Sequence, residues 1–194
     1  RTSSGSGFSC WLPLFHDMGL VGNALHAIHA GSCCILMAPN DFMMRPQSWL
    51  KVISRHEVDF AGGPNFAFDH CVDRHRPSDE EDLDLSSWRV AFNGAEPVKA
   101  GTLDRFVATF GRVGFAAKSF FPCYGMAEAT VMASGKRAPE LLPIRCDREG
   151  NPQIGCGPAL PGEDLAIVDP TDMCRLPAEV VGEIWVGGPN IVSR

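Results

Sequence analysis

Short apolar runs alternate with longer mixed stretches along roughly the first 138 residues of the chain. Each apolar run is four to six residues long, which suits a buried β-strand. These candidate strands lie at residues 33–38, 58–61, 88–92 and 118–121. Candidate helices lie between them, at residues 18–30, 46–56, 65–74 and 98–110, and a further helix is expected to begin near Met126. Strands that alternate with helices in this way predict an α/β fold, a parallel sheet with flanking helices.

The composition of the sequence changes after about Ala138. Proline and glycine become frequent there, and two short runs, Leu165–Val168 and Glu183–Val186, predict strands. We therefore expect two parts in this chain. An α/β part covers residues 1–138, and a small β-rich subdomain begins at residue 139 and continues to residue 194.

The net charge and the hydropathy of the chain limit the kinds of partner that we expect it to bind. The chain of 194 residues has a formal net charge of -6 and an isoelectric point of about 5.5, so no nucleic acid partner is expected. An anionic ligand would need local backbone N–H groups, a metal ion or a few basic residues. No stretch approaches the ~20 apolar residues that cross a bilayer, so we expect no transmembrane segment.

Eight cysteines raise the question of disulfides or a zinc site. They contain no Cys-x-x-Cys pair and most lie in apolar sequence, so we expect buried free thiols and a cytoplasmic protein. No signal peptide is visible, and the chain begins at Arg1 rather than at methionine. Core packing is preferred over zinc binding for the four residues with suitable ligand types, His26, His29, Cys33 and Cys34.

Three glycine-containing loops follow predicted strands, at residues 62–65, 93–97 and 122–128. Ligands bind beyond the carboxyl ends of parallel strands, and glycine lets the backbone approach a ligand closely. Tyr124, the only tyrosine, offers a flat face to an aromatic base, and Glu128 offers a carboxylate to Mg²⁺. A half-buried core aromatic and a solvated charge explain the same two residues, and spacing alone favours this second interpretation.

Five blocks of sequence, in order along the chain, bear on this choice. They are WLPLFHDMGL at residues 11–20, AGGPNFA at 61–67, LSSWRVAFNGAEP at 85–97, FPCYGMAEAT at 121–130 and GEIWVGG at 182–188. The set resembles the adenylate-forming ligases and, within them, the fatty acyl-AMP ligases. The similarity runs from about residue 9 to the end of the chain, which implies part of the large N-terminal domain of such a ligase.

The resemblance implies a role for each matching residue. The turn that would pass along the adenine of ATP consists of Asn93, Gly94, Ala95, Glu96 and Pro97. Tyr124 would stack on the adenine, with Gly125 and Met126 beside it, and Glu128 would bind Mg²⁺ on the ATP phosphates. His16 would act where the acyl pocket meets the nucleotide. Lining of the acyl pocket is expected from Met18, Gly62 and Phe66.

The implied reaction joins a fatty acid to AMP and releases pyrophosphate. In this family the acyl-adenylate then passes to the phosphopantetheine of an acyl carrier protein. Coenzyme A as the acceptor is the first alternative, and a non-catalytic remnant that only binds nucleotide or a partner is the second.

Three parts of the family pattern are absent from this sequence. They are the phosphate loop with its lysine, the ribose-binding aspartate block and the C-terminal domain with the catalytic lysine. We therefore expect the chain alone to be inactive.

Overall fold

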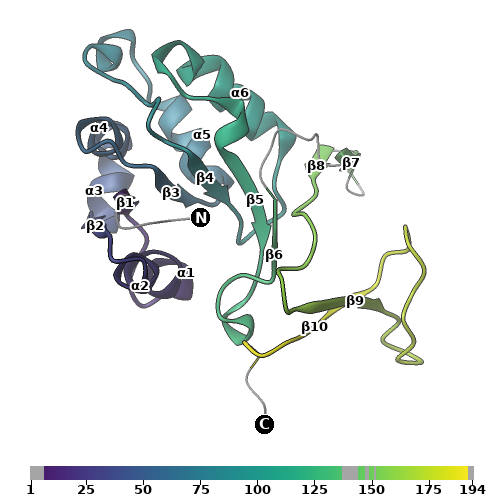
Figure 1. Cartoon of the computed structure of the whole chain (residues 1–194). Helices are drawn as coiled ribbons and strands as arrows, with labels where there is room; N and C mark the ends of the chain where they lie inside the picture. The colour runs from purple at the N-terminus through teal and green to yellow at the C-terminus, as the bar shows by residue number, and fades with distance from the viewer. Residues whose placement is uncertain (1–6, 137–143, 147–148, 151, 192–194) are drawn as a thin grey trace.

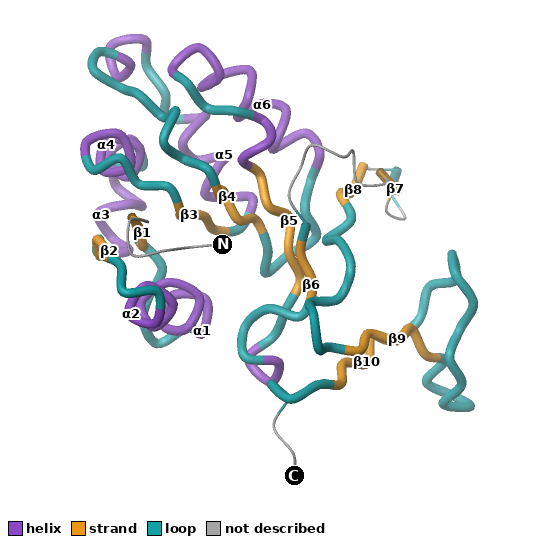
Figure 2. The backbone as a smooth tube through the Cα atoms, in the orientation of Figure 1, coloured by secondary structure: helices purple, strands orange, loops and turns teal. Residues whose placement is uncertain are grey.

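A computed structural model describes residues 7–136, 144–146, 149–150 and 152–191. Its main sheet has the strand order β2-β1-β3-β4-β5-β6 (Figures 1 and 2). The strands are β1 (Gly7–Cys10), β2 (Cys33–Leu36), β3 (Phe60–Gly63), β4 (Val90–Asn93), β5 (Phe120–Tyr124) and β6 (Ser134–Gly135). The first five are parallel, and β6 is antiparallel to β5. The predicted parallel sheet with flanking helices is confirmed.

One face of the sheet packs against four helices, α3 (Pro39–Met44), α4 (Gln47–Arg55), α5 (Asn65–Asp73) and α6 (Ala100–Phe110). Side chains alternate along a strand, and Ala61, Ala91 and Phe120 point to this face, where they join the buried core. Aromatic rings dominate that core. The Trp49 and Trp88 rings meet edge to face with centroids 5.1 Å apart. This layer supplies most of the apolar burial that holds the sheet together.

A single helix covers the other face of the sheet, over residues 17–29. It consists of α1 (Asp17–Gly19), a π-helical segment η1 (Leu20–Leu25) and α2 (His26–His29). Asn23 is buried within the π-helical segment, and its amide donates to the Met18 carbonyl oxygen at 2.8 Å. A π-helical segment widens the helix locally and is often found at functional sites. We refer to these residues as the cover helix.

Smaller elements complete the described chain. Short 3₁₀ turns are η2 (Pro77–Glu80), η3 (Gly111–Val113), η4 (Ala117–Ser119) and η5 (Ala127–Ala129). Two antiparallel pairs follow, β7 (Ile144–Cys146) with β8 (Pro152–Ile154) and β9 (Asp164–Val168) with β10 (Glu183–Gly187). The strands predicted at Leu165–Val168 and Glu183–Val186 are confirmed as β9 and β10. The boundary predicted at residues 138 and 139 lies outside the described residues.

Two local expectations were wrong, and one helix was not predicted. The helix expected near Met126 is only the three-residue turn η5, because Thr130 and Val131 follow it with φ of 49° and 80°. The strand expected to be buried near Cys33 is β2, the edge of the sheet, where Leu36 is 54% exposed. Helix α3, which begins at Pro39 and ends shortly before Pro46, was not predicted.

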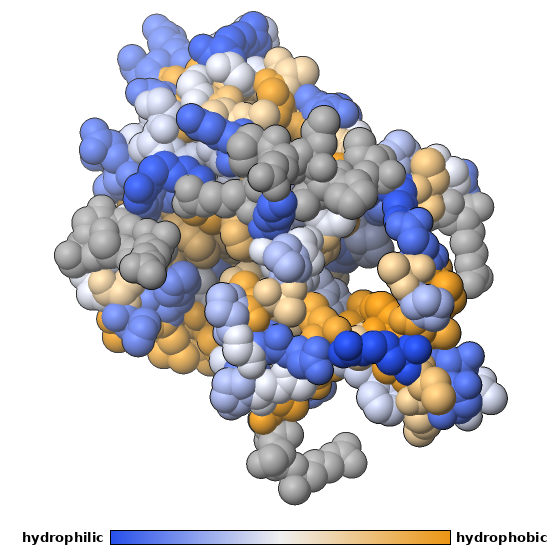
Figure 3. All heavy atoms as spheres, turned by 45° about the vertical axis from the view of Figure 1, so that its right-hand side comes forward, coloured by the Kyte–Doolittle hydropathy of each residue, from blue (hydrophilic) through white to orange (hydrophobic). Residues whose placement is uncertain are grey.

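The thiols and the surface add two findings. All eight cysteines are described and free, but Cys33, Cys146 and Cys174 are exposed, contrary to the expectation of burial. Within the described ranges, no helix is long and apolar enough to span a membrane. Exposed apolar side chains occur on the cover helix, where Ile28 is 73% exposed, and near β10; Figure 3 shows apolar patches among polar surface.

Candidate functional site

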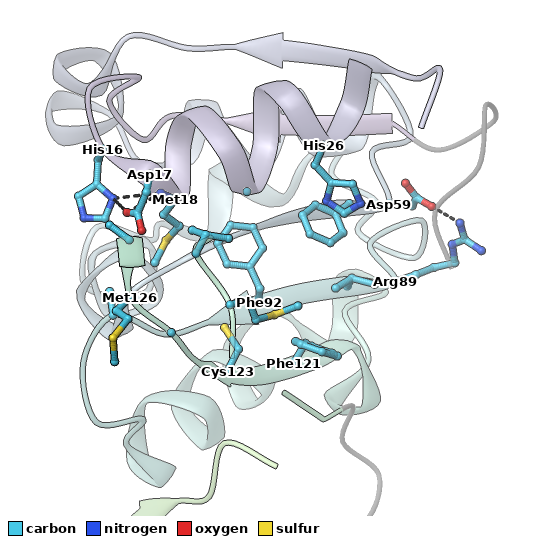
Figure 4. Close-up of a pocket in the computed structure, with 18 residues that line it drawn as sticks. His16, Asp17, Met18, His26, Asp59, Arg89, Phe92, Phe121, Cys123 and Met126 are labelled. Atoms are coloured by element: carbon cyan, nitrogen blue, oxygen red, sulfur yellow. Dashed lines mark hydrogen bonds and ion pairs between the residues drawn. The ribbon is translucent and has the colours of Figure 1, made fainter. Parts of the chain in front are cut away.

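A cavity of about 650 Å³ lies between the cover helix and the sheet (Figure 4). Its walls are mainly apolar. The residues that line it are His16, Asp17, Met18, Gly22, His26, Asp59, Phe60, Arg89, Val90, Phe92, Ala95, Phe121, Cys123, Gly125, Met126, Ala127, Val131 and Met132. Its volume lies in the range of small-molecule binding sites.

Two sequence periodicities place these walls. On the cover helix, Met18, Gly22 and His26 are spaced by four residues and therefore share one face. On the strands, alternate residues point to the same face, so Phe92 on β4 and Cys123 on β5 face the cavity. Neighbouring positions in these strands face the aromatic core instead.

The two ends of the cavity are polar, and they lie at opposite ends of the strands. Figure 4 shows His16 and Asp17 at one end and Asp59 and Arg89 at the other, with Phe92 between them. His16 and Asp17 lie at the carboxyl edge of the sheet, near the loops that follow β4 and β5. Asp59 directly precedes β3 and Arg89 directly precedes β4, so that pair marks the amino edge.

His16 caps the start of the cover helix. Its Nδ1 lies 3.1 Å from the Met18 backbone nitrogen and 2.6 Å from Asp17 Oδ1. Both contacts orient the imidazole at the cavity mouth. A proton on Nδ1 favours the Asp17 contact, whereas the unprotonated nitrogen can accept from Met18.

A second cavity of about 230 Å³ adjoins the first and shares three of its residues. The shared residues are His16, Met18 and Ala95, and Phe66 contributes to the second cavity alone. Its other walls are Trp11, Leu12, Pro13 and Pro64. His16 thus lies where two hydrophobic spaces meet at the carboxyl edge of the sheet.

The loop after β4 is fixed by an amide pair. Asn93 is fully buried, and its Nδ2 donates to Asn65 Oδ1 at 3.2 Å. Asn65 in turn donates to the Pro97 carbonyl oxygen at 2.9 Å and accepts from the Lys99 backbone nitrogen at 3.0 Å. The Asn93 side chain therefore holds the loop from below, while Ala95, Glu96 and Pro97 are exposed on it.

Close backbone contacts join the loops after β4 and β5. A Cβ at Gly94 would lie 2.7 Å from the Cys123 carbonyl oxygen, and one at Gly125 would lie 1.9 Å from that of Val131. Neither position has room for a side chain. Ala95 has a φ of 70°, an unusual conformation for a residue with a Cβ, and such strain concentrates at ligand sites.

Tyr124 and Glu128 lie beside the cavity mouth and do not line either cavity. Tyr124 ends β5 and is half-buried, and Glu128 is exposed on η5. Glu128 makes no ion pair with another described residue. Mg²⁺ commonly takes one or two carboxylates together with substrate phosphates, and a free carboxylate in this place fits that requirement.

The turn η5 is tied to the end of β10 through Asn190. The Asn190 side-chain amide donates to the Ala129 carbonyl oxygen and to Glu163 Oε1, each at 2.8 Å. Thr130 Oγ1 donates to the Asn190 carbonyl oxygen at 2.9 Å. These bonds connect the turn that carries Glu128 to the β9–β10 hairpin.

Burial inside the cavity suppresses charge on two groups. Burial raises the pKa of the Cys123 thiol to about 12, so it stays protonated and is a poor nucleophile. Burial also lowers the pKa of His26, against a hydrogen bond from its ring to the Gly22 carbonyl that raises it. The His26 ring lies edge-on to Phe8 and Phe60, with centroids 5.1 and 5.2 Å away. Burial therefore favours the neutral forms of both His26 and Cys123.

The cavities bring together six of the predicted site residues: His16, Met18, Phe66, Ala95, Gly125 and Met126. Gly62 lies on the cavity face of β3, but the Phe92 ring covers it, so it is not a wall. Four other predicted residues lie around the cavity mouth but do not line either cavity: Asn93, Gly94, Glu96 and Pro97.

Sequence reasoning missed His26, Asp59 and Arg89, which line the cavity. The spacing of four residues from Met18 could have indicated His26. Asp59 and Arg89 could have been found as the charged residues that precede two buried strands.

Comparison with known proteins gives matches over almost the whole chain. Residues 2–194 match the AMP-binding enzyme family. The medium-chain-fatty-acid–[acyl-carrier-protein] ligase TtuA of Teredinibacter turnerae is 41% identical over 202 residues, covering 96% of this chain and 32% of the relative. The long-chain-fatty-acid–AMP ligase FadD32 of Mycolicibacterium smegmatis is 36% identical, covering 93% of this chain and 32% of the relative. The chain spans about a third of the length of these relatives.

Solved structures give the same picture. The crystal structure of a fatty acid AMP ligase from Legionella pneumophila superposes with a TM-score of 0.88 at 36% identity, covering 98% of this chain and 36% of that chain. A fatty acyl-adenylate ligase from L. pneumophila, in complex with acyl adenylate and pyrophosphate, superposes with a TM-score of 0.87 at 36% identity. The match covers 97% of this chain and 36% of that chain.

Proposed function

The chain belongs to the AMP-binding enzyme family, and from that membership we propose that it is the central part of an ATP-dependent fatty acid ligase. The observation that supports this function is the long apolar cavity. It opens at the carboxyl edge of the sheet, beside the loops after β4 and β5, and extends under the cover helix to the amino edge. A nucleotide at the edge and an alkyl chain in the cavity would bring a carboxylate to the α-phosphate.

The reaction is the attack of the fatty acid carboxylate on the α-phosphate of ATP, with pyrophosphate leaving. The chain's own residues would bind and orient the two substrates. Tyr124 would stack on the adenine, and the turn of residues 93–97 would follow its edge. His16, at the junction of the two cavities, would lie beside the reacting carboxylate.

Glu128 is the residue that we assign to Mg²⁺. The ion, when bound, would offset negative charge on the ATP phosphates. Glu128 is exposed at the mouth and makes no ion pair with another described residue, which leaves its carboxylate available for this role.

The acceptor of the acyl group is proposed to be an acyl carrier protein. Two relatives, TtuA of Teredinibacter turnerae and JamA of Moorena producens, are named as ligases of medium-chain fatty acids to acyl carrier protein, at 41% and 40% identity. Coenzyme A is the second candidate acceptor. We place the reaction in the cytoplasm, in keeping with eight free cysteines.

Fatty-acid-dependent exchange of pyrophosphate into ATP tests the proposal. We expect exchange in the full-length gene product and none in the 194-residue chain. The variant Glu128→Gln should lose most of the exchange and recover part of it at high Mg²⁺, because a neutral amide is a weaker ligand than a carboxylate. Glu183→Gln, an exposed carboxylate on β10, is the matched control.

Absence of exchange with every acid from short to long would overturn the ligase assignment and favour the non-catalytic alternative. Equal loss in Glu128→Gln and Glu183→Gln would remove Glu128 from the metal role. The acceptor is then resolved separately, by supplying the adenylate with carrier protein or coenzyme A.

A further inference from the structure

The far end of the large cavity is lined by an ion pair as well as by apolar side chains. Asp59 and Arg89 line the cavity together, and Figure 4 shows them at the end opposite His16. Arg89 Nη2 donates to Asp59 Oδ2. An ion pair at the end of an otherwise apolar space is unexpected, because apolar walls alone would enclose an alkyl chain.

Asp59 is a fixed anchor. Its side chain is 11% exposed, and its Oδ1 accepts a hydrogen bond from the Gly7 backbone nitrogen at 2.9 Å. Its backbone is held as firmly: the Asp59 nitrogen donates to the Gly7 carbonyl oxygen at 3.0 Å, and its own carbonyl oxygen accepts from Arg89 and Val90. The carboxylate is thus built into the amino edge of three neighbouring strands.

Arg89 is the more exposed partner. Its side chain is 59% exposed, so the guanidinium reaches solvent while part of the residue borders the cavity. A long cationic side chain often covers apolar surface with its stem and keeps its head in water. The bond to Asp59 fixes the guanidinium and so restrains the part of Arg89 that lines the cavity.

We propose that the Asp59–Arg89 pair is the stop that sets the upper limit of acyl chain length; this inference rests on the proposed function. Arg89 directly precedes β4 and Ala95 lies two residues beyond its end, so a chain from the mouth to the stop spans on the order of 15–20 Å at ~3.3 Å per strand residue. A longer chain must displace Arg89 and bring methylene groups against a buried carboxylate. Arg89 is therefore a specificity-determining residue for acyl length.

The test uses the full-length protein and saturated acids from short to long. Acyl-AMP formation is measured for each acid, and the readout is kcat/KM for acids longer than the wild-type optimum, divided by that for the optimum. The variants are Arg89→Ala and the double variant Asp59→Asn/Arg89→Ala. The double variant leaves no unpaired buried carboxylate and so guards against misfolding of the single variant.

The expected result is a rise of about tenfold or more in this ratio, since one methylene in an apolar pocket changes kcat/KM by about 10–200-fold. Arg105→Ala is the matched control. Arg105 also pairs with a carboxylate, Asp69 on α5, but it lies outside both cavities. The Arg105→Ala variant should therefore have the same kcat/KM ratio as the wild type.

An unchanged ratio in the folded double variant would overturn the inference while leaving the ligase assignment intact. A rise in Arg105→Ala as large as in Arg89→Ala would overturn it too. A wild-type protein that adenylates no acid would instead remove the proposed function on which the inference rests.

Discussion

Single residues at the site act mainly by what they leave room for or hold in place. Asn93 was expected beside the adenine, yet its side chain is buried and bonded to Asn65. Gly62 was expected in an acyl pocket, yet it makes room for the Phe92 ring, which is the wall. The face to which each side chain points depends on strand register, and the sequence blocks do not contain that information.

Gly62 gives the sharpest stability prediction at this scale. A Cβ there would lie 2.1 Å from the Phe92 carbonyl oxygen and 2.5 Å from its ring. We expect Gly62→Ala to lower the free energy of unfolding by about 1–3 kcal/mol, as overpacking does. The ring would also be driven into the cavity.

Gly101 in α6 is the matched control, because no atom lies within 4 Å of a Cβ built there. Gly101→Ala should raise the free energy of unfolding by about 0.4–1 kcal/mol. Urea denaturation of both variants measures the difference, and similar shifts in the two would disprove the close-approach explanation.

His26 predicts a pH dependence. Burial lowers its pKa below the ordinary 6.5, and the nearby His29 acts in the same direction. The unfolded chain therefore binds a proton at His26 more readily than the folded chain. Stability should be full above pH 6.5 and fall as the pH drops from there toward the lowered pKa. The Asp59–Arg89 ion pair lines the same cavity. This pair is present both in the wild type and in a variant that lacks His26.

Urea denaturation between about pH 7 and pH 5 tests whether stability falls as the pH is lowered. His26→Gln should lose less stability over this range than the wild type, since it removes the group that titrates. His56→Gln, at the exposed end of α4, is the control and should follow the wild-type slope. Parallel slopes in all three proteins would exclude His26 as the cause.

At the scale of elements, the sheet and the long helices could be predicted from periodicity, and the short ones could not. α4, α5 and α6 have apolar positions at helical spacing and end near the predicted residues. The turn η5 could not be predicted, because Thr130 and Val131 have left-handed backbone, with the Val131 carbonyl packed against Gly125. Both residue types ordinarily avoid that conformation.

Two phenylalanines of α5, Phe66 and Phe68, are expected to have different roles, one in binding and the other in stability. Phe68 is fully buried in the aromatic core, whereas Phe66 is 45% exposed and lines the second cavity. We expect Phe68→Ala to cost about 3–5 kcal/mol of unfolding free energy. Phe66→Ala should cost about 1 kcal/mol or less.

The activity readout should rank the two variants in the opposite order. In the full-length protein, Phe66→Ala should alter the preference among acids more than its stability suggests. Unfolding curves and acid profiles measured together check both halves. A Phe66→Ala protein with an unchanged acid profile would remove that residue from the acyl site.

At the scale of the whole molecule, family membership was recognisable from five blocks of sequence, and that resemblance is confirmed. Four of the blocks lie in or next to strands of the main sheet, and the block at residues 182–188 covers β10. The block at residues 85–97 includes Arg89, whereas Asp59 lies outside all five blocks. Asp59 and Arg89 come together only because the sheet places β3 beside β4.

Asn190 yields a prediction at this scale, again on the proposed function. Its side-chain bonds hold η5 and thus Glu128 in place. Asn190→Ala in the full-length protein should raise the Mg²⁺ concentration for half-maximal exchange several-fold, by loss of about 1 kcal/mol of hydrogen bonding. Asn40→Ala, at an exposed position of α3, is the control and should leave this concentration unchanged. A Mg²⁺ dependence that is unchanged in Asn190→Ala would exclude the positioning role.

The same bonds have a consequence for the hairpin itself. Coupling between two parts of a molecule is reciprocal, so any ligand that steadies η5 must also steady β9 and β10. The hairpin would then report occupancy at a distance. Amide protons in β10 should exchange more slowly once nucleotide and metal are bound, and that added protection should vanish when Asn190 is replaced by alanine.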